Sequence, residues 1–184
     1  MKKWLFNPFI YIAGVRSLII GLVVMAITAL ICSFSHTHFN GLLQIGSRDT
    51  AAWRYFFEGF VVWLIPVIVF YVAGLIFSKS SIRLIDVAGT FALARWVMLF
   101  SAFTGFGMNL PDMNHHTIDD LIKAITPSFI ALGLVSLVCM VWMIALLYNA
   151  FVISCNIRKE KSVVLFIICL LIAEIAARLI IHFI

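Results

Sequence analysis

The chain has 184 residues, of which 64% are hydrophobic and 11% are charged, and its mean hydropathy is +1.15. A water-soluble domain of this size has no interior large enough to hide so much apolar surface, so composition excludes that class. The formal net charge is +5, but Lys and Arg fall in short runs between apolar segments, which is typical of membrane topology signals and not of a nucleic-acid-binding face.

The sequence therefore predicts an all-α, polytopic membrane protein with the lipid bilayer as its main solvent. We expect one domain over residues 1–184, built from five transmembrane helices and short amphipathic interfacial helices. The predicted spans are residues 17–34, 56–77, 87–107, 127–153 and 162–184.

A helix start is expected ahead of the first span, where Asn7 would cap and Pro8 would occupy the first turn. Residues 8–15 are expected to lie along the membrane surface before the chain enters it. Inside the second span, Pro66 removes one intrahelical hydrogen bond. It predicts a kink, which membrane helices tolerate when neighbouring groups bond to the freed carbonyl.

The loop before the fourth span is acidic and contains a second interfacial segment. Thr117 with Asp120 resembles a capping box, and apolar residues recur at helical spacing up to Ile125. We therefore expect a short amphipathic helix on the membrane surface at residues 117–125.

The orientation of the spans follows from the distribution of Lys and Arg. Eight of them fall at the N-terminus and in the second and fourth loops, and three fall in the first and third loops. The two sets are Lys2, Lys3, Arg16, Lys79, Arg83, Arg158, Lys159 and Lys161, against Arg48, Arg54 and Lys123. The pattern predicts a cytoplasmic membrane protein with its N-terminus in the cytoplasm and its C-terminus outside.

The cysteines lie in or beside apolar segments and show neither metal-ligand spacing nor a disulfide pattern. We interpret all four as small buried side chains, and no cofactor is predicted. They are Cys32, Cys139, Cys155 and Cys169.

The last predicted span carries three ionisable residues, Glu174, Arg178 and His182, four positions apart on one side of the helix. A charge within the bilayer costs at least about 2.5–3.5 kcal/mol, so Glu174 needs a partner. Arg95, inside the third span, lies at a comparable depth. Glu174 is expected to pair either with Arg95 across two helices or with Arg178 one turn on.

These charges allow two interpretations. In the first, a fixed ion pair joins the third and fifth spans, while Arg178 and His182 extend to the outer interface. In the second, they form a solute or proton pathway, or an anion or lipid-headgroup site that uses the surplus positive charge. Asn149 is expected to form an interhelical hydrogen bond near the cytoplasmic edge.

On the predicted topology every histidine falls on the outer face. Two pairs have suitable ligand types for Zn²⁺ or Cu²⁺, or for sensing acid pH, although solvated loop histidines are the simpler interpretation. The pairs are His36 with His38 and His115 with His116.

Five spans, a cytosolic N-terminus and an entry segment that begins Asn7-Pro8-Phe9 resemble the Yip-domain membrane proteins, particularly short bacterial members. The resemblance covers most of the chain and rests on span layout, not on a catalytic motif. It implies a role in membrane organisation or trafficking. It carries over no site residues, since this chain lacks the long polar N-terminal region and the motif associated with GTPase binding.

The residues show no phosphate-binding glycine loop, no Ser-His-Asp arrangement and no nucleotide-binding pattern, so a non-enzymatic function is expected. The favoured prediction is a protein of membrane organisation or a scaffold subunit. Its expected partners are the bilayer, other membrane proteins or further copies of this chain, and not nucleic acid. The alternatives are a small ion or solute transporter, which with five spans would need an oligomer, and an outer-face metal or pH sensor.

Overall fold

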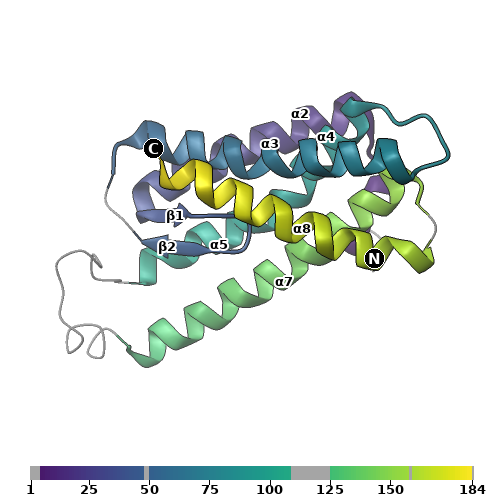
Figure 1. Ribbon diagram of the computed structural model, residues 1–184. Coiled ribbons are helices and arrows are strands. Elements are labelled where there is room, and N and C mark those ends of the chain that lie inside the picture. The colour runs from purple at the N-terminus through teal and green to yellow at the C-terminus, as the bar shows by residue number, and fades with distance from the viewer. Residues whose placement is uncertain (1–4, 48–49, 109–124, 158, 184) are drawn as a thin grey trace.

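Long helices run alongside one another through most of the molecule, which is a computed structural model (Figure 1). It describes residues 5–47, 50–108, 125–157 and 159–183. The longer helices are α2 (Gly14–Ser35), α3 (Ala52–Phe77), α4 (Leu84–Ala94), α5 (Met98–Thr104), α7 (Pro127–Cys155) and α8 (Lys159–His182). Short 3₁₀ turns are η1 (Pro8–Ile10), η2 (Arg95–Val97) and η3 (Gly105–Gly107), and the strands are β1 (Thr37–Phe39) and β2 (Ile45–Ser47).

Within the described residues, five helical segments are long and apolar enough to cross a membrane, which confirms the predicted all-α, multi-pass architecture. They are Gly14–Ser35, Ala52–Phe77, Leu84–Gly107, Pro127–Cys155 and Ser162–His182. The predicted bounds differ by a few residues, most at the start of α3. There Trp53, Arg54 and Tyr55 already belong to the helix, because aromatic and basic side chains suit the membrane interface.

The third span is not one regular helix. It consists of α4, η2, α5 and η3 in succession, so its hydrogen bonding tightens to the 3₁₀ pattern at Arg95–Val97 and again at Gly105–Gly107. A 3₁₀ stretch inside a helix marks a local departure from α geometry.

Small residues bring α2 and α4 into close contact. A Cβ placed on Gly21 would collide with the backbone of Ala92, and one on Gly89 would collide with Ser17. Such small-residue interfaces let transmembrane helices approach and gain van der Waals contact where hydrophobic exclusion from water is absent.

An aromatic cluster joins four helices. The ring of Phe70 in α3 lies 5.0 Å from that of Phe91, 4.9 Å from that of Phe151 and 5.4 Å from that of Phe166, centroid to centroid. These partners come from α4, α7 and α8. The packing fixes the relative positions of these helices.

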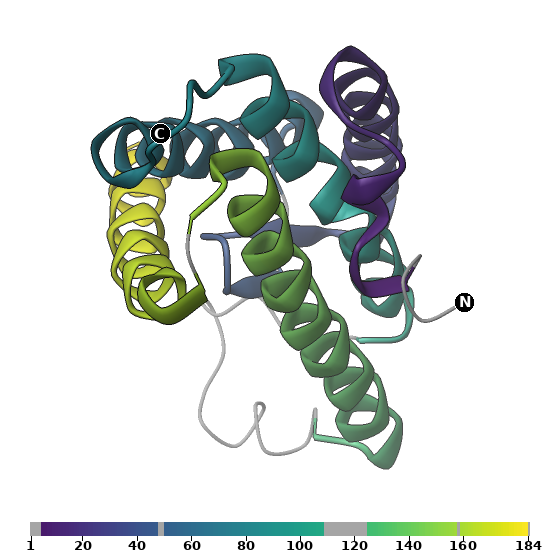
Figure 2. The same cartoon turned by 90° about the vertical axis from the view of Figure 1, so that its right-hand side faces the viewer.

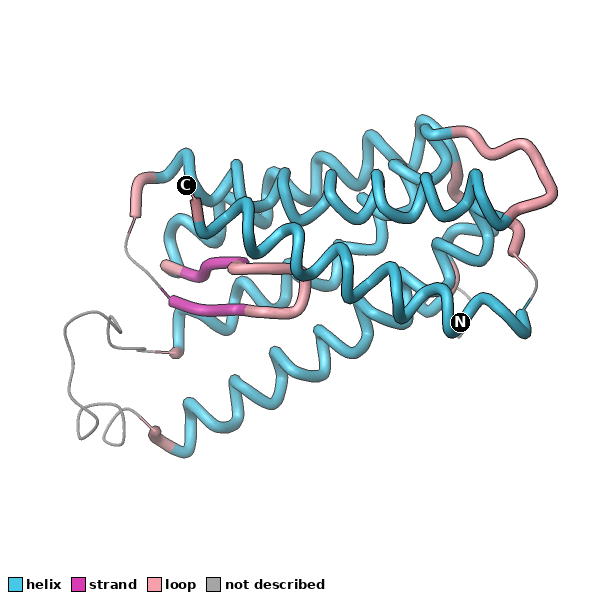
Figure 3. Tube along the Cα trace, viewed as in Figure 1, coloured by secondary structure: helices cyan, strands magenta, loops and turns pink. Residues whose placement is uncertain are grey.

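Strands β1 and β2 form an antiparallel hairpin that lies among the helices, where the sequence predicted only a polar loop (Figure 3). Thr37 pairs with Ser47 and Phe39 with Ile45. Because Phe39 and Leu42 are buried, we describe this segment as a re-entrant hairpin. Irregular backbone at membrane depth is tolerated where protein surrounds it.

Helix α7 diverges from the other helices toward its N-terminal end, as Figures 1 and 2 show. Its later turns pack against the segment before α2. There the Trp142 indole donates to the carbonyl of Leu5 at 2.9 Å.

The two predicted interfacial helices have different outcomes. The surface helix expected at residues 8–15 is wrong: before α2 begins at Gly14 the chain forms only η1, in which Pro8 and Phe9 are buried, and Asn7 makes no side-chain cap. The helix expected at residues 117–125, with its capping box, lies outside the described residues apart from Ile125.

Candidate functional site

Glu174 of α8 binds the tip of the re-entrant hairpin. Its Oε2 accepts backbone N–H bonds from Leu42 at 2.6 Å and Leu43 at 3.0 Å, and its Oε1 accepts from Arg178 Nε at 2.6 Å. The Glu174 side chain is 10% exposed. Of the two pairings expected for Glu174, the one with Arg178 is therefore correct and the one with Arg95 is wrong.

The hairpin tip can approach Glu174 because it contains glycine. A Cβ on Gly41 would lie 2.6 Å from Glu174 Oε1, closer than side-chain carbons come to oxygen. The turn itself is closed by Asn40, whose backbone N–H donates to the Gln44 carbonyl at 3.1 Å. Asn-Gly is a favoured sequence for tight turns.

Arg95 has a different role from the one expected. Its guanidinium donates to the Val62 carbonyl at 3.3 Å and lies 5.7 Å from the ring centroid of Phe39. Val62 precedes Pro66 by four residues, so its carbonyl is the one that Pro66 has no N–H to serve. Membrane helices tolerate an internal proline when a neighbour bonds to the freed carbonyl, and Arg95 is that neighbour here.

His38 and Glu58 form a buried pair between the hairpin and α3. His38 Nδ1 lies 2.7 Å from Oε2 and 2.9 Å from Oε1 of Glu58, and its Nε2 lies 3.1 Å from the Thr50 hydroxyl. The imidazole also stacks on Tyr55, with ring centroids 4.4 Å apart. His38 is only 1% exposed, so the interpretation as a solvated loop histidine is wrong for this residue.

The hypothesis that the histidines bind a metal gains no support among the described residues. Both ring nitrogens of His38 already have protein partners, while His36 ends α2 in the left-handed conformation, with φ 52°. Among the described residues, no group of three or more His, Cys, Asp or Glu side chains could hold a metal ion. His115 and His116 lie outside the described residues.

An open, mostly polar cavity of about 660 Å³ lies where α3 begins and α8 ends. We call it the arginine basin, and it is lined by Asn40, Gln44, Arg54, Arg178, Leu179, Ile181, His182 and Phe183. The Arg178 side chain is 51% exposed even though its Nε is bound to Glu174. The two arginines come from different helices, and the polar side chains of Asn40 and Gln44 come from the hairpin.

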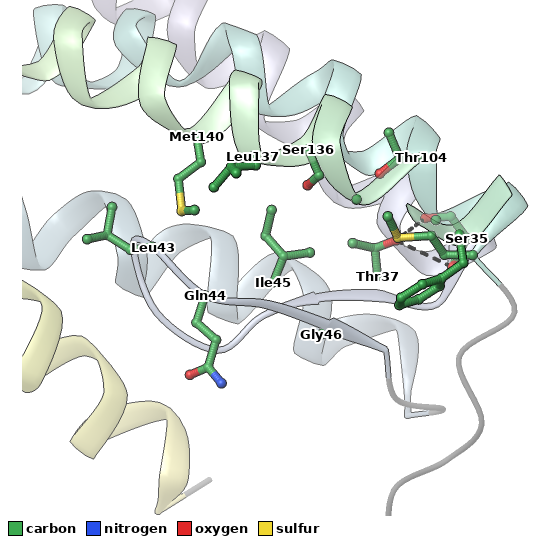
Figure 4. Close-up of a pocket in the computed structure, with 14 residues that line it drawn as sticks. Ser35, Thr37, Leu43, Gln44, Ile45, Gly46, Thr104, Ser136, Leu137 and Met140 are labelled. Carbon is green, nitrogen blue, oxygen red and sulfur yellow. Dashed lines mark hydrogen bonds between the residues drawn. The ribbon is translucent and has the colours of Figure 1, made fainter. Parts of the chain in front are cut away.

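A second cavity, of about 410 Å³, lies between the hairpin and α7 (Figure 4). Its hydroxyl groups are bonded within the protein: Ser136 to Ser101 at 2.5 Å, and Thr37 to Ser35 at 2.8 Å. Gln44 extends away from the other labelled side chains in Figure 4. What remains of the lining is largely apolar, which suits hydrocarbon better than a charged ligand.

The remaining predicted residues are accounted for in part. Asn149 does form a hydrogen bond, but its partner is the Phe6 carbonyl of the N-terminal segment at 2.8 Å, not another transmembrane helix. The interpretation of the cysteines as buried is confirmed for all four, Cys32, Cys139, Cys155 and Cys169.

Sequence reasoning missed the contribution of Glu58 and of the hairpin backbone. A usable signal was present, since Glu58 stands in an apolar span and needs a neutralising neighbour as much as Glu174 does. The Asn40-Gly41 turn between two short runs with β-branched and aromatic residues was a second signal.

Comparison with family models, with curated proteins and with solved structures found no match to this chain. The resemblance to Yip-domain proteins therefore stays a prediction.

Proposed function

We propose that this multi-pass membrane protein is a non-enzymatic scaffold or partner subunit of the cytoplasmic membrane. The observation that carries the proposal is that its buried ionisable groups hold backbone and side chains in fixed positions. Glu174 binds two hairpin N–H groups, Arg95 binds the Val62 carbonyl, and Glu58 binds His38. Groups used in this way stabilise one conformation instead of moving a charge.

The same contacts argue against a transport pathway. A conducting path needs polar groups that line water-filled space across the membrane. Beside Arg95 the cavity measures about 10 Å³, which is close to the volume of one water probe. The larger arginine basin lies at the end of α8, where Arg178 and His182 line it.

A re-entrant hairpin bonded to both α3 and α8 suits a scaffold, because these bonds fix the shape of one end of the bundle, on which another membrane protein can pack. A role in membrane organisation is also what the Yip-like layout implies. The proposed partners are other membrane proteins or further copies of this chain.

The proposal includes the orientation given by the basic residues, with the N-terminus in the cytoplasm and the C-terminus outside. Maleimide labelling of introduced cysteines tests it, since the four native cysteines are buried. An impermeant maleimide should label Phe183→Cys in intact cells, and should label Ser80→Cys only after the membrane is opened. The reverse pattern would overturn the orientation.

Flux measurements test the choice between scaffold and transporter. Purified protein in proteoliposomes should give no proton, chloride or phosphate flux above that of empty vesicles. Flux that is present in the wild type and lost in Glu174→Gln would replace the scaffold proposal with transport.

A further inference from the structure

We propose that the arginine basin binds a phosphate-type oxyanion, supplied either by a lipid headgroup or by free phosphate. Arg54 of α3 and Arg178 of α8 line the same cavity, with His182 beside them. Asn40 and Gln44 add side-chain amides from the hairpin. The cavity of about 660 Å³ has room for a phosphodiester headgroup.

The charges around the basin favour an anion. Arg178 lines the cavity and binds Glu174 through Nε, so the bond to Glu174 does not use the two terminal nitrogens of its guanidinium. Glu174 is turned inward, with Oε2 on the hairpin N–H groups, and neutralises one arginine at most. Arg54 is then a positive charge in excess of the carboxylates that line the basin in the described part of the chain.

Arginine is suited to this ligand by geometry as well as by charge. Its planar fork of N–H donors matches two oxygens of a phosphate, and charge-assisted bonds of this kind are about twice as strong as neutral ones. Two forks from different helices, at one cavity, can contact one phosphate from two directions. The hairpin behind them is held to α8 by the two backbone N–H bonds to Glu174, which limits rearrangement on binding.

The basin lies at the ends of two membrane-spanning helices, where lipid phosphates are expected. Arg54 stands in the first turn of α3, His182 is the last residue of α8, and the neighbouring Trp53 is 58% exposed. Aromatic and basic residues at span ends lie at the level of the headgroups. Leu179 and Phe183 place apolar surface on the same cavity, beside which an acyl chain can begin.

Thermal unfolding in an uncharged detergent tests the proposal, followed by the fluorescence of the five tryptophans. The probes are inorganic phosphate, a short-chain phosphatidylglycerol and the matching phosphatidylcholine, whose phosphate is paired with its own choline. We expect a saturable rise in melting temperature with phosphatidylglycerol, with phosphate, or with both. Phosphate alone identifies a free anion, and phosphatidylglycerol alone identifies a lipid.

Arg54→Gln is the decisive variant, because Arg54 has no role in holding the hairpin in the contacts described above. It should weaken binding about tenfold, the effect of losing one charge-assisted hydrogen bond. Arg83→Gln removes the same charge from the exposed loop between α3 and α4, at the other end of the spans, and should leave affinity unchanged. His182→Gln gives a second, milder test.

Three results would overturn the proposal. The first is no saturable shift with either anion. The second is an equal shift with phosphatidylcholine, which would mean that acyl chains and not the anion are bound. The third is an equal loss of affinity in Arg54→Gln and Arg83→Gln, which would mean that the loss comes from the change in net charge and not from a contact in the basin.

Discussion

The surroundings of Arg95 and of Glu174 show two uses of charge within one membrane protein. Each charged group satisfies backbone atoms that irregular structure leaves without a helical partner: Arg95 serves the carbonyl freed by Pro66, and Glu174 serves the hairpin tip. They differ in enclosure. Arg95 is only 5% exposed, whereas Arg178, the partner of Glu174, is 51% exposed at its side chain.

This difference separates a structural site from a binding site. A charge enclosed on every side has its donors directed at the protein alone, and removing it leaves the backbone unsatisfied. A charge at the edge of the bundle meets the same structural need with some of its donors and presents the others to a cavity. Substitutions at these residues and their neighbours test that separation, and the largest effect is expected at Glu174.

Glu174→Leu should destabilise the protein most. It leaves the buried N–H of Leu42 and the part-buried N–H of Leu43 without an acceptor, at a cost of about 2–4 kcal/mol, and removes the partner of the half-exposed Arg178. Glu174→Gln should lose less, since an amide oxygen still accepts. Denaturant unfolding in mixed micelles measures both, with the lipid-facing Ile175→Leu as the control. Wild-type stability in Glu174→Leu would show that the hairpin does not depend on this residue.

Arg95→Met should cost about 1.5–3 kcal/mol, the value of a hydrogen bond to a charged group. The cost should fall in a Pro66→Ala background, because the N–H of residue 66 can then bond to the Val62 carbonyl. A double-mutant cycle on unfolding free energy should give a coupling of about 0.5–3 kcal/mol. Additive effects would mean that Arg95 and Pro66 act independently.

Gly41→Ala should displace the hairpin tip, since a Cβ there meets the Glu174 carboxylate. Overpacking of this kind costs about 1–3 kcal/mol. Gly59→Ala is the matched control, because a Cβ at Gly59 meets nothing within 4 Å. Equal melting temperatures for the two variants would contradict the close approach.

Asn149→Ala removes one neutral hydrogen bond, to the Phe6 carbonyl, and should have the smallest effect. A loss of about 0.5–1.5 kcal/mol is expected. Proteolysis before α2 should become faster as that segment loses a contact to α7. An unchanged cleavage rate would mean that the other contacts of the segment, among them Trp142 with Leu5 and the buried Phe9, suffice to hold it.

The spans could be predicted from the sequence because lipid exposure requires long apolar runs, and the structure places helices over those runs. The need for a partner at Glu174 was equally predictable. Its hairpin partners were not, because the strands are three residues each, too short to show a period, and His38 and Asn40 suggested a solvated loop.

The role of Arg95 depends on how α3 and α4 align, which fixes the depth of Val62 against that of Arg95. Hydropathy locates each span but does not set the register between two of them. Charge alone therefore suggested Glu174 as the partner of Arg95. The partner in the structure is the Val62 carbonyl that Pro66 leaves free, and only the three-dimensional arrangement could identify it.

The hairpin also constrains the order in which the chain can mature. Leu42 and Leu43 obtain their acceptor from a residue 132 and 131 positions later, in the helix that follows the other described spans. Until the ribosome has delivered α8 to the membrane, the hairpin tip has no carboxylate to bind. This end of the protein can therefore assemble only after α8 has been inserted into the membrane. A nascent chain stalled before α8 is expected to leave the hairpin exposed to chaperones or membrane proteases.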